Sequence, residues 1–228
     1  MNKKQKIILL ISIIIISLPI IYNKNINSQK TILNLGDQFS LGIDSYGIKD
    51  YGYIEYYKDY IEKKYHKVTI KNQYAKKELS IKELNYEIVI NPKLKKDLRD
   101  SSILFLSIGY NDLLYQLSVD KKQKSSKIIE KVSNDYKKLI QEIQKYHHQK
   151  IIIVGYSIPK GNNKKLQNII KKWNKILKNS NKVIFIDSEK ILKPQTKYFS
   201  NPNNTYPNKQ GYQAISNKII QKHLKNNK

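Results

Sequence analysis

The chain has 228 residues, a formal net charge of +25 and no cysteine. Its length suits one domain with a terminal extension, and one domain of this size can bury a hydrophobic core. The absence of cysteine excludes disulfides, zinc–thiolate sites and cysteine nucleophiles.

The positive charge does not by itself indicate a nucleic-acid-binding protein. Nearly all basic residues are lysines, and Arg99 is the only arginine, whereas arginine makes the bidentate contacts to phosphates and bases. Heavy use of Ile, Asn, Lys and Tyr fits an AT-rich coding sequence. We therefore expect no specific nucleic-acid partner. A surface of this charge should still attract anionic lipids or an anionic cell-envelope polymer, and salt should weaken that attraction.

The N-terminus reads as a membrane-targeting segment. Lys3, Lys4 and Lys6 precede an apolar run from Ile7 to Tyr22. The run is short for a membrane span of about 20 residues and also resembles the hydrophobic part of a secretory signal. It predicts one N-terminal hydrophobic helix that acts as a signal anchor, with a cleaved signal peptide as the alternative.

The charge flanking this segment predicts its orientation. Lysines before the run favour a cytoplasmic N-terminus. We expect a single-pass protein of the cell membrane whose C-terminal domain is extracytoplasmic, or a secreted protein if the signal is cleaved. The expected domains are the signal anchor or signal peptide at residues 1–22, a short polar tether at 23–30 and one domain at 31–228.

The domain alternates apolar runs with amphipathic stretches. Strands are predicted at Thr31–Leu35, Lys67–Lys71, Ser102–Ile108, Ile151–Tyr156 and Val183–Asp187, and helices at Tyr53–Tyr65, Ile81–Ile90, Ser125–His147, Asn163–Lys178 and Gln210–Leu224. Strands separated by helices of ten or more residues form parallel sheets with helices on both faces. The pattern predicts an α/β fold, flavodoxin-like and three-layered (α/β/α), with a five-stranded parallel sheet.

Three polar loops are candidates for a site. They contain Gly36-Asp37-Gln38, Gly109-Tyr110-Asn111-Asp112 and the segment from Asn203 to Gly211. Ligands of such sheets bind outside the carboxyl ends of the strands. We therefore expect these loops to meet at one edge of the sheet.

The same three loops resemble the SGNH (GDSL) hydrolase family. "LGDQFSLG" resembles the family's first block, a strand followed by Gly-Asp-Ser-Leu. "SIGYNDLL" resembles the third block, Gly-x-Asn-Asp, and "NNTYPNKQGYQAISNKI" resembles the last, Asp-x-x-His-Pro-Asn-x-x-Gly-Tyr. Order and spacing fit from Thr31 to the end of the chain. The resemblance implies an esterase-type hydrolase fold, and we expect neither a cofactor nor a metal.

The chain departs from this family at every position of the catalytic relay. The nucleophilic serine is replaced by Gln38, the general-base histidine by Tyr206, and the orienting aspartate by Asn203. The second-block glycine, whose amide helps to bind the oxyanion in the family, falls on Lys77 or Glu78.

Only Asn111 matches a residue that binds the oxyanion in the family. A carboxamide cannot attack a carbonyl, and a phenol with a pKa near 10 is a poor base at neutral pH. Loss of one triad member typically costs orders of magnitude in rate. The pattern favours a pseudoenzyme, a binding or accessory module for a glycan or another polar ligand at the cell envelope.

The candidate ligand-binding residues are Asp37, Gln38, Gly109, Asn111 and Tyr206, with Asn203 as a further family-equivalent position. The alternative function is an active esterase or acyltransferase with a rearranged site that uses Ser40 or Asp37. Asp37 is also expected to form an Asx turn, and Asp112 to cap the helix that follows it. The histidines are expected at the surface; they are His66, His147, His148 and His223. The oligomeric state is left open.

Overall fold

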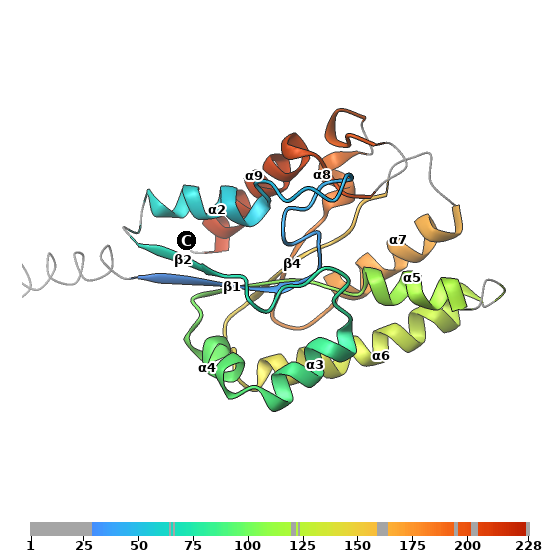
Figure 1. Cartoon of the computed structure of the whole chain (residues 1–228), viewed down its shortest axis with the longest axis horizontal. Helices are drawn as coiled ribbons and strands as arrows, with labels where there is room; N and C mark the ends of the chain where they lie inside the picture. Colours follow the sequence, from blue (N-terminus) through green and yellow to red (C-terminus); the bar gives the residue numbers. More distant parts are fainter. Residues whose placement is uncertain are drawn as a thin grey trace, which may run out of the picture.

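Figure 1 shows the computed structural model, which describes residues 29–63, 65, 67–119, 122, 124–158, 164–193, 196–201 and 205–226. The predicted hydrophobic helix at residues 1–22 and most of the tether at 23–30 lie outside this part of the chain, as do His66 and Asn203. Within it, no helix combines the length and the apolar character needed to cross a membrane.

Five parallel strands form a single sheet. They are β1 (Lys30–Gly36), β2 (Val68–Lys71), β3 (Ile103–Ser107), β4 (Ile151–Val154) and β5 (Val183–Ile186). Their order is β2-β1-β3-β4-β5, and every pairing is parallel. This order is that of flavodoxin-like folds. The predicted five-stranded parallel sheet is confirmed.

Helices cover both faces of the sheet (Figure 1). One layer contains α2 (Tyr53–Glu62), α8 (Ser188–Leu192) and α9 (Lys209–Asn226), which contact one another around α9. The other contains α3 (Ile81–Ile90), α4 (Pro92–Asp100), α5 (Tyr110–Val119), α6 (Ser125–Gln144) and α7 (Lys164–Lys178). A short 3₁₀ turn, η1 (Thr196–Tyr198), precedes α9. The three-layer architecture is therefore also as predicted.

The apolar pattern predicted no range for three of these helices, α4, α5 and α8, although Asp112 was expected to cap a helix at the position of α5. Asn91 both ends α3 and begins α4, because its side-chain oxygen accepts hydrogen bonds from the N–H groups of Lys93 and Leu94 at 3.0 and 3.1 Å. Pro92 then occupies the first position of α4, where its fixed φ suits a helix. The predicted helix Ile81–Ile90 coincides with α3, and α4 follows it after the single residue Asn91.

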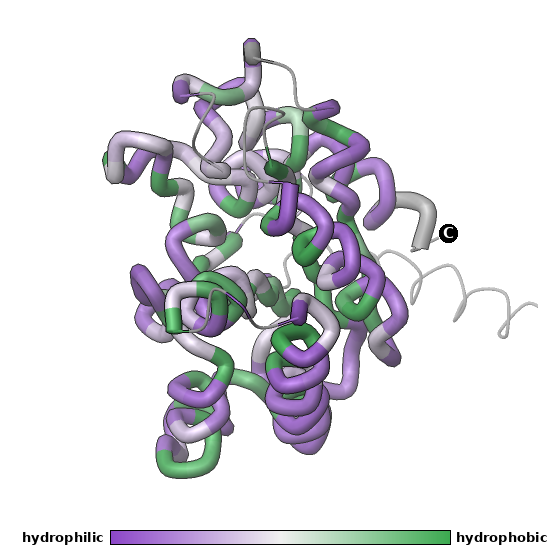
Figure 2. The backbone as a smooth tube through the Cα atoms, turned by 90° about the vertical axis from the view of Figure 1, so that its right-hand side faces the viewer, coloured by the Kyte–Doolittle hydropathy of each residue, from purple (hydrophilic) through white to green (hydrophobic). Residues whose placement is uncertain are grey.

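The core consists of strand residues buried on both faces and of the inner sides of the helices. All four residues of β4 are buried, as are Leu104, Phe105 and Leu106 of β3. In Figure 2 the turns of the helices carry both hydrophilic and hydrophobic colours, as expected for helices with one buried face. The prediction that all four histidines lie at the surface is wrong for His147. Its ring is buried, and Nδ1 lies 3.0 Å from the Leu98 carbonyl oxygen.

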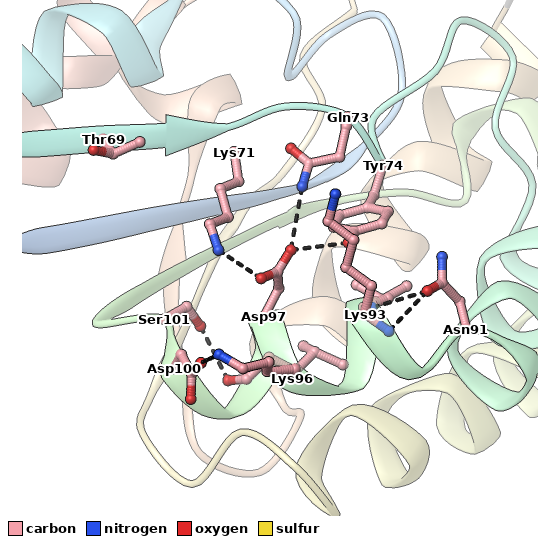
Figure 3. Close-up of polar contacts among 12 residues, drawn as sticks. Thr69, Lys71, Gln73, Tyr74, Asn91, Lys93, Lys96, Asp97, Asp100 and Ser101 are labelled. Carbon is pink, nitrogen blue, oxygen red and sulfur yellow. Dashed lines mark hydrogen bonds and ion pairs between the residues drawn. The ribbon is translucent and has the colours of Figure 1, made fainter.

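A buried carboxylate fixes the loop between β2 and α3. Asp97 of α4 accepts hydrogen bonds from Gln73 Nε2 at 3.2 Å and from the Tyr74 hydroxyl at 2.9 Å, and it forms an ion pair with Lys71 (Figure 3). The same loop is tied to the end of β1 by the Lys76 N–H, which donates to the Gly36 carbonyl at 3.0 Å. The loop is thereby held against the carboxyl end of β1, where it supplies part of the site.

Candidate functional site

The turn after β1 presents Gln38 at the carboxyl ends of β1 and β3. The Asp37 N–H donates to the Ser107 carbonyl at 3.0 Å, which continues the β1–β3 pairing by one residue. Asp37 Oδ1 accepts the Phe39 N–H at 3.1 Å, so the predicted Asx turn is present. Gln38 follows at the top of this turn and is half-buried.

The carboxamide of Gln38 uses its full hydrogen-bonding capacity. Oε1 accepts from the Glu78 backbone N–H at 2.9 Å and from Asn111 Nδ2 at 3.4 Å. Nε2 donates to Asn111 Oδ1 at 3.3 Å and to the Tyr206 hydroxyl. A primary amide offers two donors and two acceptor sites. The four contacts therefore hold this side chain in one orientation.

The backbone at Glu78 adopts a conformation that favours glycine. Glu78 has φ +58°, in the left-handed region that glycine adopts most readily. This conformation points the Glu78 N–H at the site, where it donates to Gln38 Oε1. Of the two positions that the sequence allowed, Lys77 and Glu78, only Glu78 has this conformation and donates to Gln38.

Two donors thus converge on one oxygen at the carboxyl ends of the strands. The Glu78 N–H and Asn111 Nδ2 both approach Gln38 Oε1. In acyl transfer, such a pair of preorganised donors stabilises the negative oxygen of the tetrahedral intermediate. In this chain the oxygen between the donors belongs to the protein's own side chain.

Tyr206 completes this polar group from the segment before α9. Its hydroxyl accepts from Gln38 Nε2, and its ring lies edge-on to Tyr110 with a centroid distance of 6.3 Å. Burial, and then the negative charge of Asp37, raise the pKa of the Tyr206 phenol far above its usual value. The phenol therefore stays protonated at neutral pH and cannot act there as a general base.

The two nucleophiles of the alternative function are buried beneath the turn. The Asp37 carboxylate is fully buried, with Oδ2 accepting the Tyr156 hydroxyl at 2.7 Å. The Ser40 side chain is 1% exposed, and its hydroxyl donates to the Asp37 carbonyl at 2.8 Å. Neither side chain reaches the surface beside Gln38.

Burial raises the pKa of Asp37 to about 7, although hydrogen bonds from Tyr156 and the Phe39 N–H oppose the shift. Between pH 4 and pH 7 the folded protein keeps a proton that the unfolded chain, with a pKa of 3.8, releases. The stabilisation that Asp37 contributes is therefore fully present below pH 4. As the pH rises to 7, the free energy of unfolding falls by about 4 kcal/mol because of this group.

Replacing this carboxyl isolates its effect on stability. Asp37→Asn removes the titration but keeps an oxygen that can accept from Tyr156. We expect the variant's free energy of unfolding, relative to the wild type, to rise by several kcal/mol between pH 4 and pH 7.5. Urea denaturation of both proteins across this range measures it. A difference between the two proteins that does not vary with pH would show that Asp37 is already ionised in the fold.

A cleft of about 700 Å³ opens beside Gln38. Its walls come from the β2–α3 loop, α3, α5 and α6, and its lining includes Gln38, Glu78, Lys82, Asn111, Asp112, Tyr115, Gln116, Lys131 and Asp135. Gln38 and Asn111 form one end of it. Tyr115 is 64% exposed, so its ring is available to a ligand.

The cleft differs in charge from the molecule as a whole. Three carboxylates line it, from Glu78, Asp112 and Asp135, against two lysines, although the chain carries a net charge of +25. Both lysines have partners: Lys82 lies 3.8 Å from Asp135, and Lys131 donates to Gln116. The cleft therefore favours neutral or cationic ligands over anions.

Asp112 has a different role from the one predicted. It lies inside the first turn of α5, and both of its carboxylate oxygens accept the Ile81 N–H, each at 3.2 Å. It thus caps α3 instead of its own helix. Burial raises its pKa to about 6.

Gly109 shapes the site without facing a ligand. Its φ is +103°, and a Cβ built there would lie 2.3 Å from Trp173 Cζ2. Only glycine fits this close approach, which lets the chain turn from β3 into α5 and places Asn111 beside Gln38.

The structure brings together three of the residues predicted for the site, Gln38, Asn111 and Tyr206. Asp37 lies buried below them, and Asn203 lies outside the described residues. The sequence left the amide of the second block open between Lys77 and Glu78, and it did not reveal the partner of Asp37, Tyr156. Across the described part of the chain, no cluster of three His, Asp or Glu side chains could hold a metal ion.

The model of one protein family matches most of the chain. Residues 22–219 match the GDSL-like lipase/acylhydrolase family. The chain belongs to this family. At the position that matches the GDSL serine it has Gln38, whose Oε1 accepts from the Glu78 N–H and from Asn111 Nδ2.

Solved structures of the same fold include a lipase, a G-D-S-L family protein and an acetylxylan esterase. A lipase from a goat rumen metagenome has a TM-score of 0.71 and 19% identity, covering 84% of this chain and 96% of its own. A G-D-S-L family protein from Veillonella parvula has a TM-score of 0.61 and 20% identity, with coverage of 85% and 97%. Axe2, an acetylxylan esterase from Geobacillus stearothermophilus, has a TM-score of 0.64 and 16% identity, with coverage of 86% and 95%. No curated protein matches the chain.

Proposed function

We propose that this GDSL-family chain does not hydrolyse esters and instead binds a polar ligand in the cleft beside Gln38. The ligand class that fits the cleft best is a neutral glycan. One observation carries the proposal: Gln38 Oε1 occupies the position between the Glu78 N–H and Asn111 Nδ2. A substrate carbonyl must displace this oxygen to reach the two donors. Having done so, it meets a carboxamide where the family has its nucleophile.

Among the described residues around Gln38, none replaces the lost relay. The Ser40 hydroxyl is buried and donates to a backbone carbonyl, and the Asp37 carboxyl is enclosed. The Tyr206 phenol holds its proton at neutral pH because burial and Asp37 raise its pKa. These contacts count against an esterase or acyltransferase that uses Ser40 or Asp37.

The cleft has the chemistry of a carbohydrate site. Amides at Asn111 and Gln116 and the carboxylate of Asp135 can pair with sugar hydroxyls, and the exposed ring of Tyr115 can cover the apolar face of a sugar. The excess of carboxylates disfavours an acidic ligand. Among proteins of the same fold, Axe2 is an acetylxylan esterase, which supports a carbohydrate as the ligand class.

The proposed location is the outer side of the cell membrane. Its support is the lysine-flanked apolar run from Ile7 to Tyr22, interpreted as a signal anchor. A module held there would meet envelope glycans. If the segment is a cleaved signal, the same domain is secreted.

The activity half of the proposal is tested with the full chain in neutral detergent and p-nitrophenyl acetate. We expect the wild type, Gln38→Ala and Ser40→Ala to hydrolyse the ester at the rate of buffer with detergent. Turnover by the wild type that disappears in Ser40→Ala would overturn the proposal and establish the alternative.

The binding half is tested by calorimetric titration with β-1,4-linked oligomers of xylose and of N-acetylglucosamine. We expect at least one series to bind, and Tyr115→Ala to weaken binding about threefold to tenfold. Tyr46→Ala is the matched control, because Tyr46 is 65% exposed and lies outside the cleft. Equal affinities for the two variants, or binding by neither series, would contradict a glycan site at this cleft.

A further inference from the structure

A second hollow lies at the β5 edge of the sheet, away from Gln38. It has a volume of about 480 Å³ and is walled by the end of α7, by β5, by α8 and by the outer side of α9. Its lining residues are Lys178, Phe185, Asp187, Lys190, Ile191, Ala214, Asn217, Lys218, Gln221 and Lys222. We call this hollow the lysine pocket.

Four of the lining side chains are lysines, and they come from three separate helices. Lys178 ends α7, Lys190 belongs to α8, and Lys218 and Lys222 lie one turn apart on α9. Asp187 is the one carboxylate in the lining, and its Oδ1 accepts the Lys190 N–H at 3.1 Å at the start of α8. The charge of the lysine pocket is thus opposite to that of the cleft beside Gln38.

The sequence around the lysine pocket supplies almost no compensating charge. Neither α7 nor α9 contains an acidic residue. After Glu142 the chain has only two carboxylate side chains, Asp187 and Glu189. The Glu189 carboxylate does not line the pocket, and its Oε1 lies 3.9 Å from Lys171 Nζ. Among the described residues that line the pocket, Asp187 is therefore the only acidic side chain beside four lysines.

The lysines are close enough to act on one another. Lys222 is half-buried and donates to the Phe185 carbonyl of β5, which holds its ammonium group at the wall of the pocket. Burial, and then the positive charges of Lys218, Lys178 and Lys190, lower its pKa, against the opposing effect of Asp187. An anion placed among these groups would relieve their mutual repulsion.

We propose that the lysine pocket binds phosphate groups. Lysine is a compact point charge with freely rotating donors, and it binds phosphate without the fixed fork of arginine. Four such groups from three helices can surround a tetrahedral anion from several directions. The lining has no exposed aromatic ring on which a base could stack, which argues against single-stranded nucleic acid. This proposal is independent of the function proposed for the cleft.

The test is calorimetric titration of the full chain, in neutral detergent at fixed ionic strength, with inorganic tripolyphosphate and with citrate. Lys190→Gln/Lys218→Gln removes two exposed lysines of the pocket, leaving Lys222 in place. Lys127→Gln/Lys137→Gln removes two equally exposed lysines from α6 and serves as the control for charge alone. Thermal melts verify that both variants are folded.

We expect the wild type to bind tripolyphosphate more tightly than citrate. The pocket variant should weaken that binding at least tenfold, and the control variant by less than twofold. Equal losses in the two variants would mean that the lysine-rich surface attracts anions without a site, and equal binding of citrate would mean that phosphate is not recognised. Either result overturns the proposal.

A further titration separates two sources of phosphate. If an oligomer of glycerol phosphate binds at least as tightly as tripolyphosphate, the ligand of the pocket is a phosphodiester polymer. Binding of tripolyphosphate alone assigns it to free phosphates.

Discussion

The triple variant Gln38→Ser/Tyr206→His/Asn203→Asp is expected to hydrolyse p-nitrophenyl acetate at least about 100-fold faster than the wild type. The two donors proposed to bind an oxyanion, the Glu78 N–H and Asn111 Nδ2, remain in this variant. The substitution at position 38 removes the carboxamide that lies between them and supplies a hydroxyl. The other two supply the base and its orienting acid at the positions that match the family motif.

None of the three single substitutions should by itself produce ester hydrolysis. Serine at position 38 facing Tyr206 has no base to remove its proton, because the phenol is protonated at neutral pH. Histidine at position 206 facing Gln38 has no nucleophile to activate. A steady-state assay of the three single variants, the triple variant and the wild type measures this cooperativity.

Asn111 provides the control for the reconstructed site. Adding Asn111→Ala to the triple variant removes one oxyanion donor, and the rate should fall about 10²-fold to 10³-fold. A folded triple variant without turnover would show that the donors are not placed for catalysis. Turnover that survives Asn111→Ala would show that the reaction occurs elsewhere on the protein.

Gly109→Ala is expected to destabilise the protein by more than about 3 kcal/mol. Two costs add at this position. The φ of +103° is unfavourable for alanine, and the new Cβ would lie 2.3 Å from Trp173 Cζ2 in the buried interface between α7 and the β3–α5 turn. The indole ring is fully buried and cannot move aside without opening the core.

Gly47→Ala separates the two costs. Gly47 also has a positive φ, +79°, but no atom lies within 4 Å of a Cβ built there. Its replacement should cost only about 1 kcal/mol, from backbone strain alone. Urea denaturation of both variants measures the difference. Equal costs would mean that the contact with Trp173 does not constrain the turn that carries Asn111.

The sheet could be predicted from the sequence because its strands are buried on both faces. Runs such as Ile151–Val154 are continuously apolar, and their alternation with long amphipathic helices fixes a parallel arrangement. The range of α5 could not be predicted because Leu114, Tyr115 and Val119 are exposed, which blurs the apolar periodicity of the segment. The boundary between α3 and α4 is a single residue, Asn91, that serves both helices.

The site could be predicted only in part from the sequence. Its side chains at 38, 111 and 206 stand in motifs that survive as sequence patterns. The Glu78 donor is a backbone N–H in a left-handed conformation, and the sequence alone could not decide between Lys77 and Glu78 because neither is glycine. The carboxylates of the cleft come from segments far apart in the chain, so their excess in a basic protein emerges only in three dimensions.

Hydrogen exchange at the backbone amide of Glu78, followed by NMR, examines most directly whether the Gln38 side chain fills the oxyanion position. Glu78 is exposed in a loop, and its N–H has Gln38 Oε1 as its acceptor. We predict slow exchange in the wild type and exchange at least about tenfold faster in Gln38→Ala, with a shift of the Asn111 side-chain amide signals. Unchanged exchange and unchanged Asn111 signals would show that the carboxamide lies elsewhere and that the oxyanion position is open.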